Sequence, residues 1–138
     1  MSLFNIMAVS GSSLEAQGLR LNTIASNLAN ANSVAGSKRD AYRARLPVFE
    51  TVYRDAAGER GASAGVRVRG VVESALPPRQ EYDPGHPLAD AEGYIYRPQI
   101  DAVDEMANMI AASRAYQNSV QTMNTAKQLM LRTLTLGR

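Results

Sequence analysis

The chain lacks cysteine altogether and holds a single histidine among its 138 residues. Without cysteine it cannot form a disulfide, a cysteine-type zinc site or a cysteine nucleophile. Its one histidine, His86, stands between Gly85 and Pro87 in a turn-rich stretch, which excludes a metal site built from several histidines and argues against a catalytic triad. We therefore expect no catalytic residues, no metal and no cofactor, and predict that the chain is not an enzyme.

An excess of charge of one sign is also missing. Lys and Arg number 15 against 13 Asp and Glu, and the first 32 residues hold one acid, Glu15, and one base, Arg20. Proteins that bind nucleic acid or an anionic membrane surface usually concentrate basic residues on one face. We therefore expect no nucleic acid among the partners.

Long apolar runs are absent as well. No stretch approaches the ~20 apolar residues that a membrane-spanning helix needs, so direct membrane insertion is not expected. The apolar stretch 3–9 is short, and no basic residue precedes it. The stretch therefore does not read as a cleavable secretory signal.

The chain does contain heptad patterns at both ends, and these predict two long helices. Apolar side chains recur there at intervals of seven, the spacing of a coiled-coil seam. Small residues accompany each series and would allow a close helix partner. The first seam comprises Met7, Leu14, Leu21 and Leu28; the second comprises Met109, Tyr116, Val120, Met123, Met130 and Leu134.

The remaining surface of the first helix carries mostly asparagine and serine, where a solvated helix usually carries Lys and Glu. Such side chains can hydrogen-bond across an interface without the large desolvation cost of a charge. The pattern predicts a helix that is buried on several sides. We expect its terminal turns to fray in the free chain and to become ordered on assembly.

Between the helices the period changes to two, which predicts short half-buried strands around residues 42–48 and 66–69. Glycine and proline mark residues 53–65 and 76–87 as loops. The predicted fold class is therefore α+β, with two terminal helices that pair as a coiled coil and a loop-rich β segment between them. Its three parts are residues 1–34, 35–99 and 100–138.

Two groups of charged residues are candidates for a functional role. Asp101, Asp104 and Glu105 could contact a divalent cation, but an N-cap with acidic residues in the first helical turn explains them better. Four arginines alternate with apolar residues on the predicted strands and are candidate outer contacts for acidic subunits, phosphate or cell-wall polymer. These arginines are Arg43, Arg45, Arg67 and Arg69.

Several segments resemble the flagellar axial proteins, the family of rod and hook subunits. The segment 25–33 (ASNLANANS) is similar to the motif that ends the first helix in that family. Segments 86–98 (HPLADAEGYIYRP), 100–120 (IDAVDEMANMIAASRAYQNSV) and 124–138 (NTAKQLMLRTLTLGR) resemble its proximal rod branch. Residues 53–64 match no motif of the family, and Gln117, Asn118 and Ser119 stand where the family often reads Gln, Ala, Asn.

The resemblance implies a subunit of the basal-body rod, exported by the flagellar type III apparatus and polymerised in the periplasm into a helical drive shaft. Its implied partners are copies of itself, other rod proteins, the rod-base adaptor and the surrounding membrane ring. Carried over residue by residue, the first motif points to Ser26, Asn27, Asn30 and Asn32. We expect these side chains to hydrogen-bond within and between subunits and to fix the register of the first helix.

Three alternatives remain open at this point. Within the same class, the chain could be another rod or hook subunit. From a different class, it could be a binding module that uses the arginine-bearing strands to hold cell-wall glycan or nucleic acid. The third alternative is an enzyme whose carboxylates form no recognisable motif.

Overall fold

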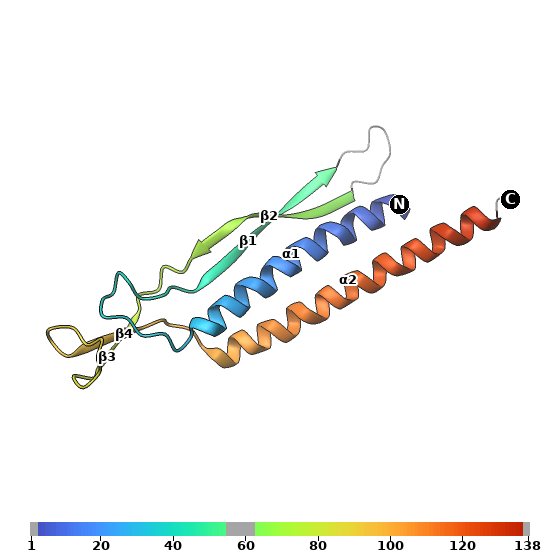
Figure 1. Cartoon of the computed structure of the whole chain (residues 1–138). Coiled ribbons are helices and arrows are strands. Elements are labelled where there is room, and N and C mark those ends of the chain that lie inside the picture. Colours follow the sequence, from blue (N-terminus) through green and yellow to red (C-terminus); the bar gives the residue numbers. More distant parts are fainter. Residues whose placement is uncertain (1–2, 55–62, 137–138) are drawn as a thin grey trace.

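The computed structural model describes residues 3–54 and 63–136. Two long helices, α1 (Leu3–Asn30) and α2 (Ala102–Leu136), lie side by side and run antiparallel (Figure 1). The end of the helix pair at which α1 stops and α2 starts is called the closed end here. The strands between the helices are β1 (Arg45–Arg54), β2 (Ser63–Glu73), β3 (Arg79–Tyr82) and β4 (Tyr94–Arg97).

Both helices begin and end near the positions that the heptads predict, and the α+β class is confirmed. The predicted cap of α2 is also confirmed: Asp101 Oδ1 accepts hydrogen bonds from the backbone N–H groups of Val103, at 2.8 Å, and Asp104, at 3.4 Å. Asp104 and Glu105 lie in the first turn, where negative charge opposes the positive end of the helix dipole. Neither described helix has a stretch apolar enough to span a membrane.

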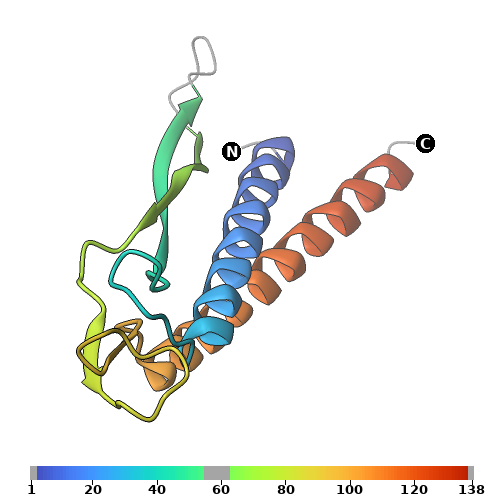
Figure 2. The same cartoon turned by 60° about the vertical axis from the view of Figure 1, so that its left-hand side comes forward.

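The hairpin formed by β1 and β2 runs along α1 on the side away from α2 (Figures 1 and 2). The two strands are antiparallel, with Val48 opposite Gly70 and Phe49 opposite Val68, so Arg69 is the extra residue of a β-bulge. Both strands are longer than predicted. The predicted loop 53–65 is therefore wrong at its edges, since β1 continues to Arg54 and β2 begins at Ser63; the rest of it, 55–62, lies outside the described residues.

A second antiparallel hairpin, β3 with β4, covers the closed end (Figure 2). The prediction of a plain loop over residues 76–87 was wrong, because β3 lies inside it. The turn before β4 needs glycine at position 93: its φ is +84°, and a Cβ there would come within 3.0 Å of the ring of Tyr82. Ala35 and Tyr96 exchange two backbone hydrogen bonds of 2.9 Å, which tie the segment after α1 to β4.

The buried apolar interior of the described chain is small. Five of its eight side chains are alanines, and the others are Ile24, Ile95 and Tyr96. Alanine lets helices approach closely but removes little apolar area from water. Large apolar residues are instead common on the surface, which indicates a chain whose packing is incomplete on its own.

Candidate functional site

The centre of the candidate site is the side chain of Asn27, near the end of α1. Only 1% of this residue is exposed. Its Oδ1 accepts hydrogen bonds from the backbone N–H of Arg45, at 2.8 Å, and from the Tyr42 hydroxyl, at 3.1 Å. Its Nδ2 donates to the Arg45 carbonyl, at 3.0 Å, and to Glu105 Oε1, at 3.3 Å. One amide thus connects α1 to the start of β1 and to the first turn of α2.

The other residues of the motif surround this amide at the closed end. The Ser26 hydroxyl lies 3.0 Å from the Tyr42 hydroxyl, and Asn30 Nδ2 donates to the Ser26 carbonyl at 2.8 Å. Asn32, by contrast, is exposed and lines a groove at the closed end together with Arg97. Three of the four predicted motif residues therefore take part in bonds inside the chain, and the fourth faces outward.

We define the polar junction as Ser26, Asn27, Tyr42, Arg45 and Glu105. The sequence pattern places Tyr42 and Arg45 on a strand and Glu105 in a first helical turn, and it does not identify these three as partners of Asn27. They lie 15, 18 and 78 positions from Asn27 along the chain. No local pattern carries such a relation, because it exists only once the elements are folded together.

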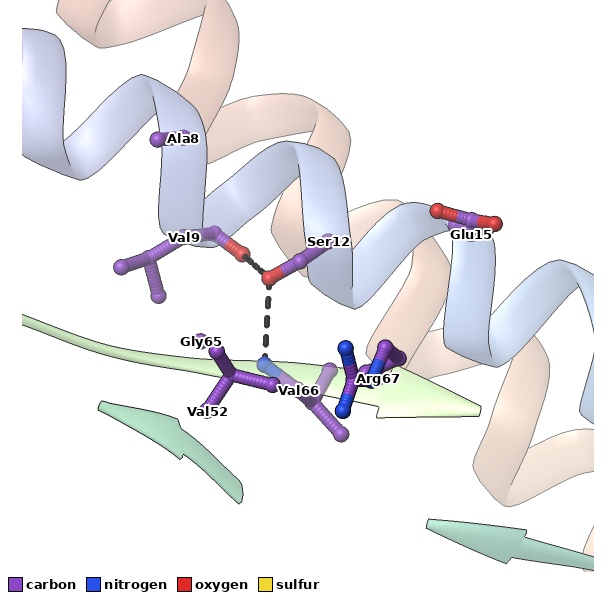
Figure 3. Close-up of a pocket in the computed structure, with 8 residues that line it drawn as sticks. All are labelled: Ala8, Val9, Ser12, Glu15, Val52, Gly65, Val66 and Arg67. Atoms are coloured by element: carbon purple, nitrogen blue, oxygen red, sulfur yellow. Dashed lines mark hydrogen bonds between the residues drawn. The ribbon is translucent and has the colours of Figure 1, made fainter. Parts of the chain in front are cut away.

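A second contact region joins α1 to the hairpin (Figure 3). Ser12 Oγ donates to the Val9 carbonyl, at 2.8 Å, and accepts a hydrogen bond from the Val66 N–H of β2, at 3.3 Å. Close approach is possible because position 65 is glycine, where a Cβ would lie 3.3 Å from Ser12 Oγ. Between α1 and β2 there remains a pocket of about 240 Å³, with Glu15 and Arg67 at its rim.

The four predicted outer arginines are all exposed. Arg67 Nε donates to Glu50 Oε1 at 2.7 Å, and the Arg45 guanidinium lies 5.8 Å from the centre of the Tyr42 ring. Arg45 also stands opposite Glu73 in the strand register. Two of these arginines thus have acidic or aromatic neighbours in the chain itself. Within residues 3–54 and 63–136, no three acidic or histidine side chains lie close enough together to bind a metal ion.

The residues of the predicted helix seam differ in exposure. Most of them are half-buried, but Tyr116 is 38% exposed and Leu134 is 67% exposed. Small residues also lie at the helix pair: Ser13 Oγ and Ser119 Oγ are 2.9 Å apart, and Ala112 and Ala126 of α2 are buried. The half-buried seam residues are Met7, Leu14, Leu21, Leu28, Met109, Val120, Met123 and Met130.

Leu134 is exposed because α1 is the shorter helix. Leu3, the first described residue, lines a groove with Leu129 of α2. The turns of α2 beyond that position have no α1 residue beside them in the part of the chain that the structure describes. The expectation that Leu134 packs in the seam is therefore wrong for the single chain.

The turn between the hairpin strands at the closed end depends on Asp90. Its Oδ1 accepts hydrogen bonds from the N–H groups of Tyr94, at 2.8 Å, and Glu92, at 3.0 Å, while its Oδ2 accepts one from the Tyr96 hydroxyl at 3.0 Å. The Tyr94 N–H contributes most to lowering the pKa of the Asp90 carboxyl, against partial desolvation, which raises it. Burial, followed by the Asp90 carboxylate, raises the pKa of Tyr96.

Comparison with known proteins gives one consistent result. Residues 7–38 match the family described as flagella basal body rod protein, and residues 91–136 match the C-terminal family of the flagellar basal body rod FlgEFG proteins. The chain is 50% identical over 138 residues to the flagellar basal-body rod protein FlgC of Salmonella typhimurium, covering 100% of both chains. It is 49% identical to FlgC of Escherichia coli O157:H7, again over 100% of both.

A more distant relative shows the same full-length match. FlgC of Buchnera aphidicola subsp. Baizongia pistaciae is 35% identical over 140 residues, with 100% of both chains covered. The first matched region spans most of α1 and its polar motif, and the second spans β4 and α2. The chain belongs to the FlgC family of flagellar basal-body rod proteins.

Proposed function

We propose that this chain is a subunit of the proximal rod, which polymerises with copies of itself and with other rod proteins into a helical tube that transmits torque. The observation that carries this proposal is the imbalance between surface and interior. Seventeen large apolar side chains are exposed in the described chain, against eight buried apolar residues that are mostly alanine. A monomer rarely leaves so much apolar surface in water, whereas a subunit buries it against its neighbours.

The helix pair is the proposed building block of the tube. α1 and α2 meet along the small residues Ser13, Ala112 and Ser119, and we propose that they supercoil as a coiled coil once neighbours cover their outer faces. Many parallel contacts of this kind resist slippage under torque better than a few strong ones, because close-packed interfaces transmit strain. The three parts 1–34, 35–99 and 100–138 then act as one unit.

The proposed role of the polar junction is to fix the hairpin on this building block. The Asn27 amide bonds both backbone groups of Arg45 and the carboxylate of Glu105, so the first residue of β1 is held against both helices. Ser26 and Asn30 support the same turn of α1. Asn32 is exposed, and we assign it to contacts between subunits.

Membership of a rod family supports a proposal about export and location. We propose export through the flagellar type III apparatus without signal cleavage, followed by assembly in the periplasm. The proposed neighbours are other rod proteins, the rod-base adaptor and the surrounding membrane ring. The exposed arginines Arg43, Arg45, Arg67 and Arg69 are candidate contacts for them.

The test is deletion of the gene in the host, with imaging of isolated basal bodies and detection of the tagged chain by mass spectrometry. Loss of rods and motility, together with presence of the chain in wild-type basal bodies, is the expected result. Normal rods in the deletion strain would overturn the proposal. Binding of the purified monomer to cell-wall glycan or to nucleic acid would then favour the binding module.

A further inference from the structure

The outer surface of α2 near the closed end carries a row of exposed apolar residues. Val103 is 69% exposed, Met106 is 47% exposed and Ile110 is 57% exposed. Their spacing of three and four places them on one face of the helix, and Arg114, also exposed, continues that face four residues later. Val103, Met106, Ile110 and Arg114 are called the α2 outer row below. α1 does not cover this row.

A face of α1 offers a matching surface. Glu15, Gly18, Asn22 and Ala25 also follow one another at steps of three and four, and they are called the α1 outer row. Glu15, Asn22 and Ala25 are exposed. Glu15 lies at the rim of the pocket between α1 and β2, and Arg67 at the same pocket already has Glu50 as its partner.

Gly18 is the least explained residue of the α1 outer row within the single chain. Glycine inside a helix costs about 1 kcal/mol relative to alanine. Its φ is not positive, and a Cβ added there would meet no atom within 4 Å. Nothing in the described chain therefore requires glycine at this position, while a large side chain from outside the chain would fit over it.

We infer that the α1 outer row receives the α2 outer row of a second copy of this chain, in antiparallel orientation, with Ile110 over Gly18, Val103 over Ala25, and Arg114 paired with Glu15. This inference rests on the proposed polymerisation and specifies one of its contacts. The spacing agrees: Gly18 and Ala25 are seven residues apart, as are Val103 and Ile110. Both pairs therefore come into register together.

Size and charge are complementary in this register. Large apolar side chains from α2 lie over a hydrogen and a methyl group on α1, which is the arrangement that lets ridges enter a groove. Glu15 is the only acid in the first 32 residues, and it meets a base. An exposed ion pair adds little affinity, but it discriminates against shifted registers, because a shift would leave both charges unpaired.

The direction of the contact follows from symmetry. α1 and α2 are antiparallel within one chain. In an array that repeats by rotation about and translation along an axis parallel to the helices, every α1 points one way and every α2 the other. α1 of one copy must then meet α2 of the next antiparallel. Each copy offers both rows, so the contact is heterologous and propagates into a filament instead of closing into a dimer.

The test uses the natural absence of cysteine. A chain carrying Gly18→Cys and Ile110→Cys replaces the wild-type gene in the flagellated host, and isolated basal bodies are oxidised and run on a non-reducing gel. A ladder of covalent multimers is expected, since each chain offers both halves of the contact. The matched control carries Ser13→Cys and Ser119→Cys, whose hydroxyls lie 2.9 Å apart in one chain, and should crosslink without forming multimers.

Charge exchange is the second measurement. Glu15→Arg and Arg114→Glu should each reduce motility on soft agar, and the variant carrying both should recover it. Basal bodies that contain the double-cysteine chain but give no ladder would overturn this contact and leave the rod function standing. Absence of the wild-type chain from basal bodies would overturn both the contact and the rod function.

Discussion

At the scale of single residues, one buried amide decides how three elements meet. Asn27 uses both donors and both acceptor positions of its side chain, and its partners come from β1, α2 and the segment that precedes β1. Because the side chain is nearly fully buried, removal of the amide would leave several polar groups without partners. The same residue could not be replaced by a charged one without a desolvation cost.

The substitution Asn27→Ala should lower the free energy of unfolding of the purified chain by about 2 to 3 kcal/mol, because buried hydrogen-bond partners are left unsatisfied. Thermal and urea unfolding followed by circular dichroism would measure this. The matched control is Asn22→Ala, an exposed asparagine on the same helix, for which a change within about 0.5 kcal/mol is expected. Equal effects of the two substitutions would contradict the junction.

Asp90 gives the turn before β4 a pH dependence. Its pKa is lowered in the folded chain, so its stabilising contribution is complete above the ordinary carboxyl pKa of about 4 and is lost as the pH falls through the lowered value. Asp90→Asn should lower the unfolding temperature at pH 7, and the gap to the wild type should narrow at pH 3. Other carboxyl groups titrate in both chains and cancel in the comparison. A gap independent of pH would rule out this carboxylate as the cause.

At the scale of elements, α2 differs along its length. In its first third Ala112 is buried, while Leu131, Leu134 and Leu136 in its last turns are 54%, 67% and 84% exposed. Isolated helical turns are marginally stable in water, since their stability depends on tertiary packing. The C-terminal turns therefore depend on neighbours that the single chain does not supply.

Hydrogen exchange should follow this gradient. In the free chain, amides around Ala112 should be protected and those from Leu131 onward should exchange at least about tenfold faster, because local opening free energies fall toward frayed ends. In isolated basal bodies, the same C-terminal amides should become protected. Hydrogen–deuterium exchange with mass spectrometry measures both states. Uniform protection along α2 in the free chain would show that its packing is already complete.

At the scale of the whole molecule, the chain is an open arrangement. Among the elements that the structure describes, α1 is the one that contacts both the β1–β2 hairpin and α2. Such a molecule has little core of its own, and the antiparallel pairing of the two helices joins the two ends of the sequence. Covalent closure of that pairing tests whether the free chain has the same architecture as the subunit.

Oxidation of purified chain carrying Ser13→Cys and Ser119→Cys should form one intrachain disulfide, given hydroxyls 2.9 Å apart. A crosslink that closes a loop of this length can raise the unfolding free energy by up to about 4 kcal/mol. The reduced form of the same variant is the control for the substitutions themselves. Formation of intermolecular species instead, at low protein concentration, would mean that the helices are apart in the free chain.

The sequence by itself determined the two helices, the cap at Asp101 and the class of protein. Heptad spacing and capping are local, so periodicity reveals them without knowledge of the fold. The motif around Asn27 pointed to the right turn of α1. It did not reveal Tyr42 and Glu105 as partners of that amide, because hydrogen bonds across 15 and 78 positions leave no local pattern.

Only the tertiary structure decided where the strands run and which apolar residues are left in water. The β3–β4 hairpin could not be predicted from the sequence, because the prolines around β3 indicate a loop. The positive φ of Gly93 in the turn before β4 is likewise not indicated by the neighbouring residues. Leu134 and Val103 both fit a helical apolar pattern, yet both are exposed. Leu134 lies beyond the start of α1 at Leu3, and Val103 lies on the side of α2 that faces away from α1. Periodicity tells which residues share a face, whereas only the packed chain tells which faces are covered.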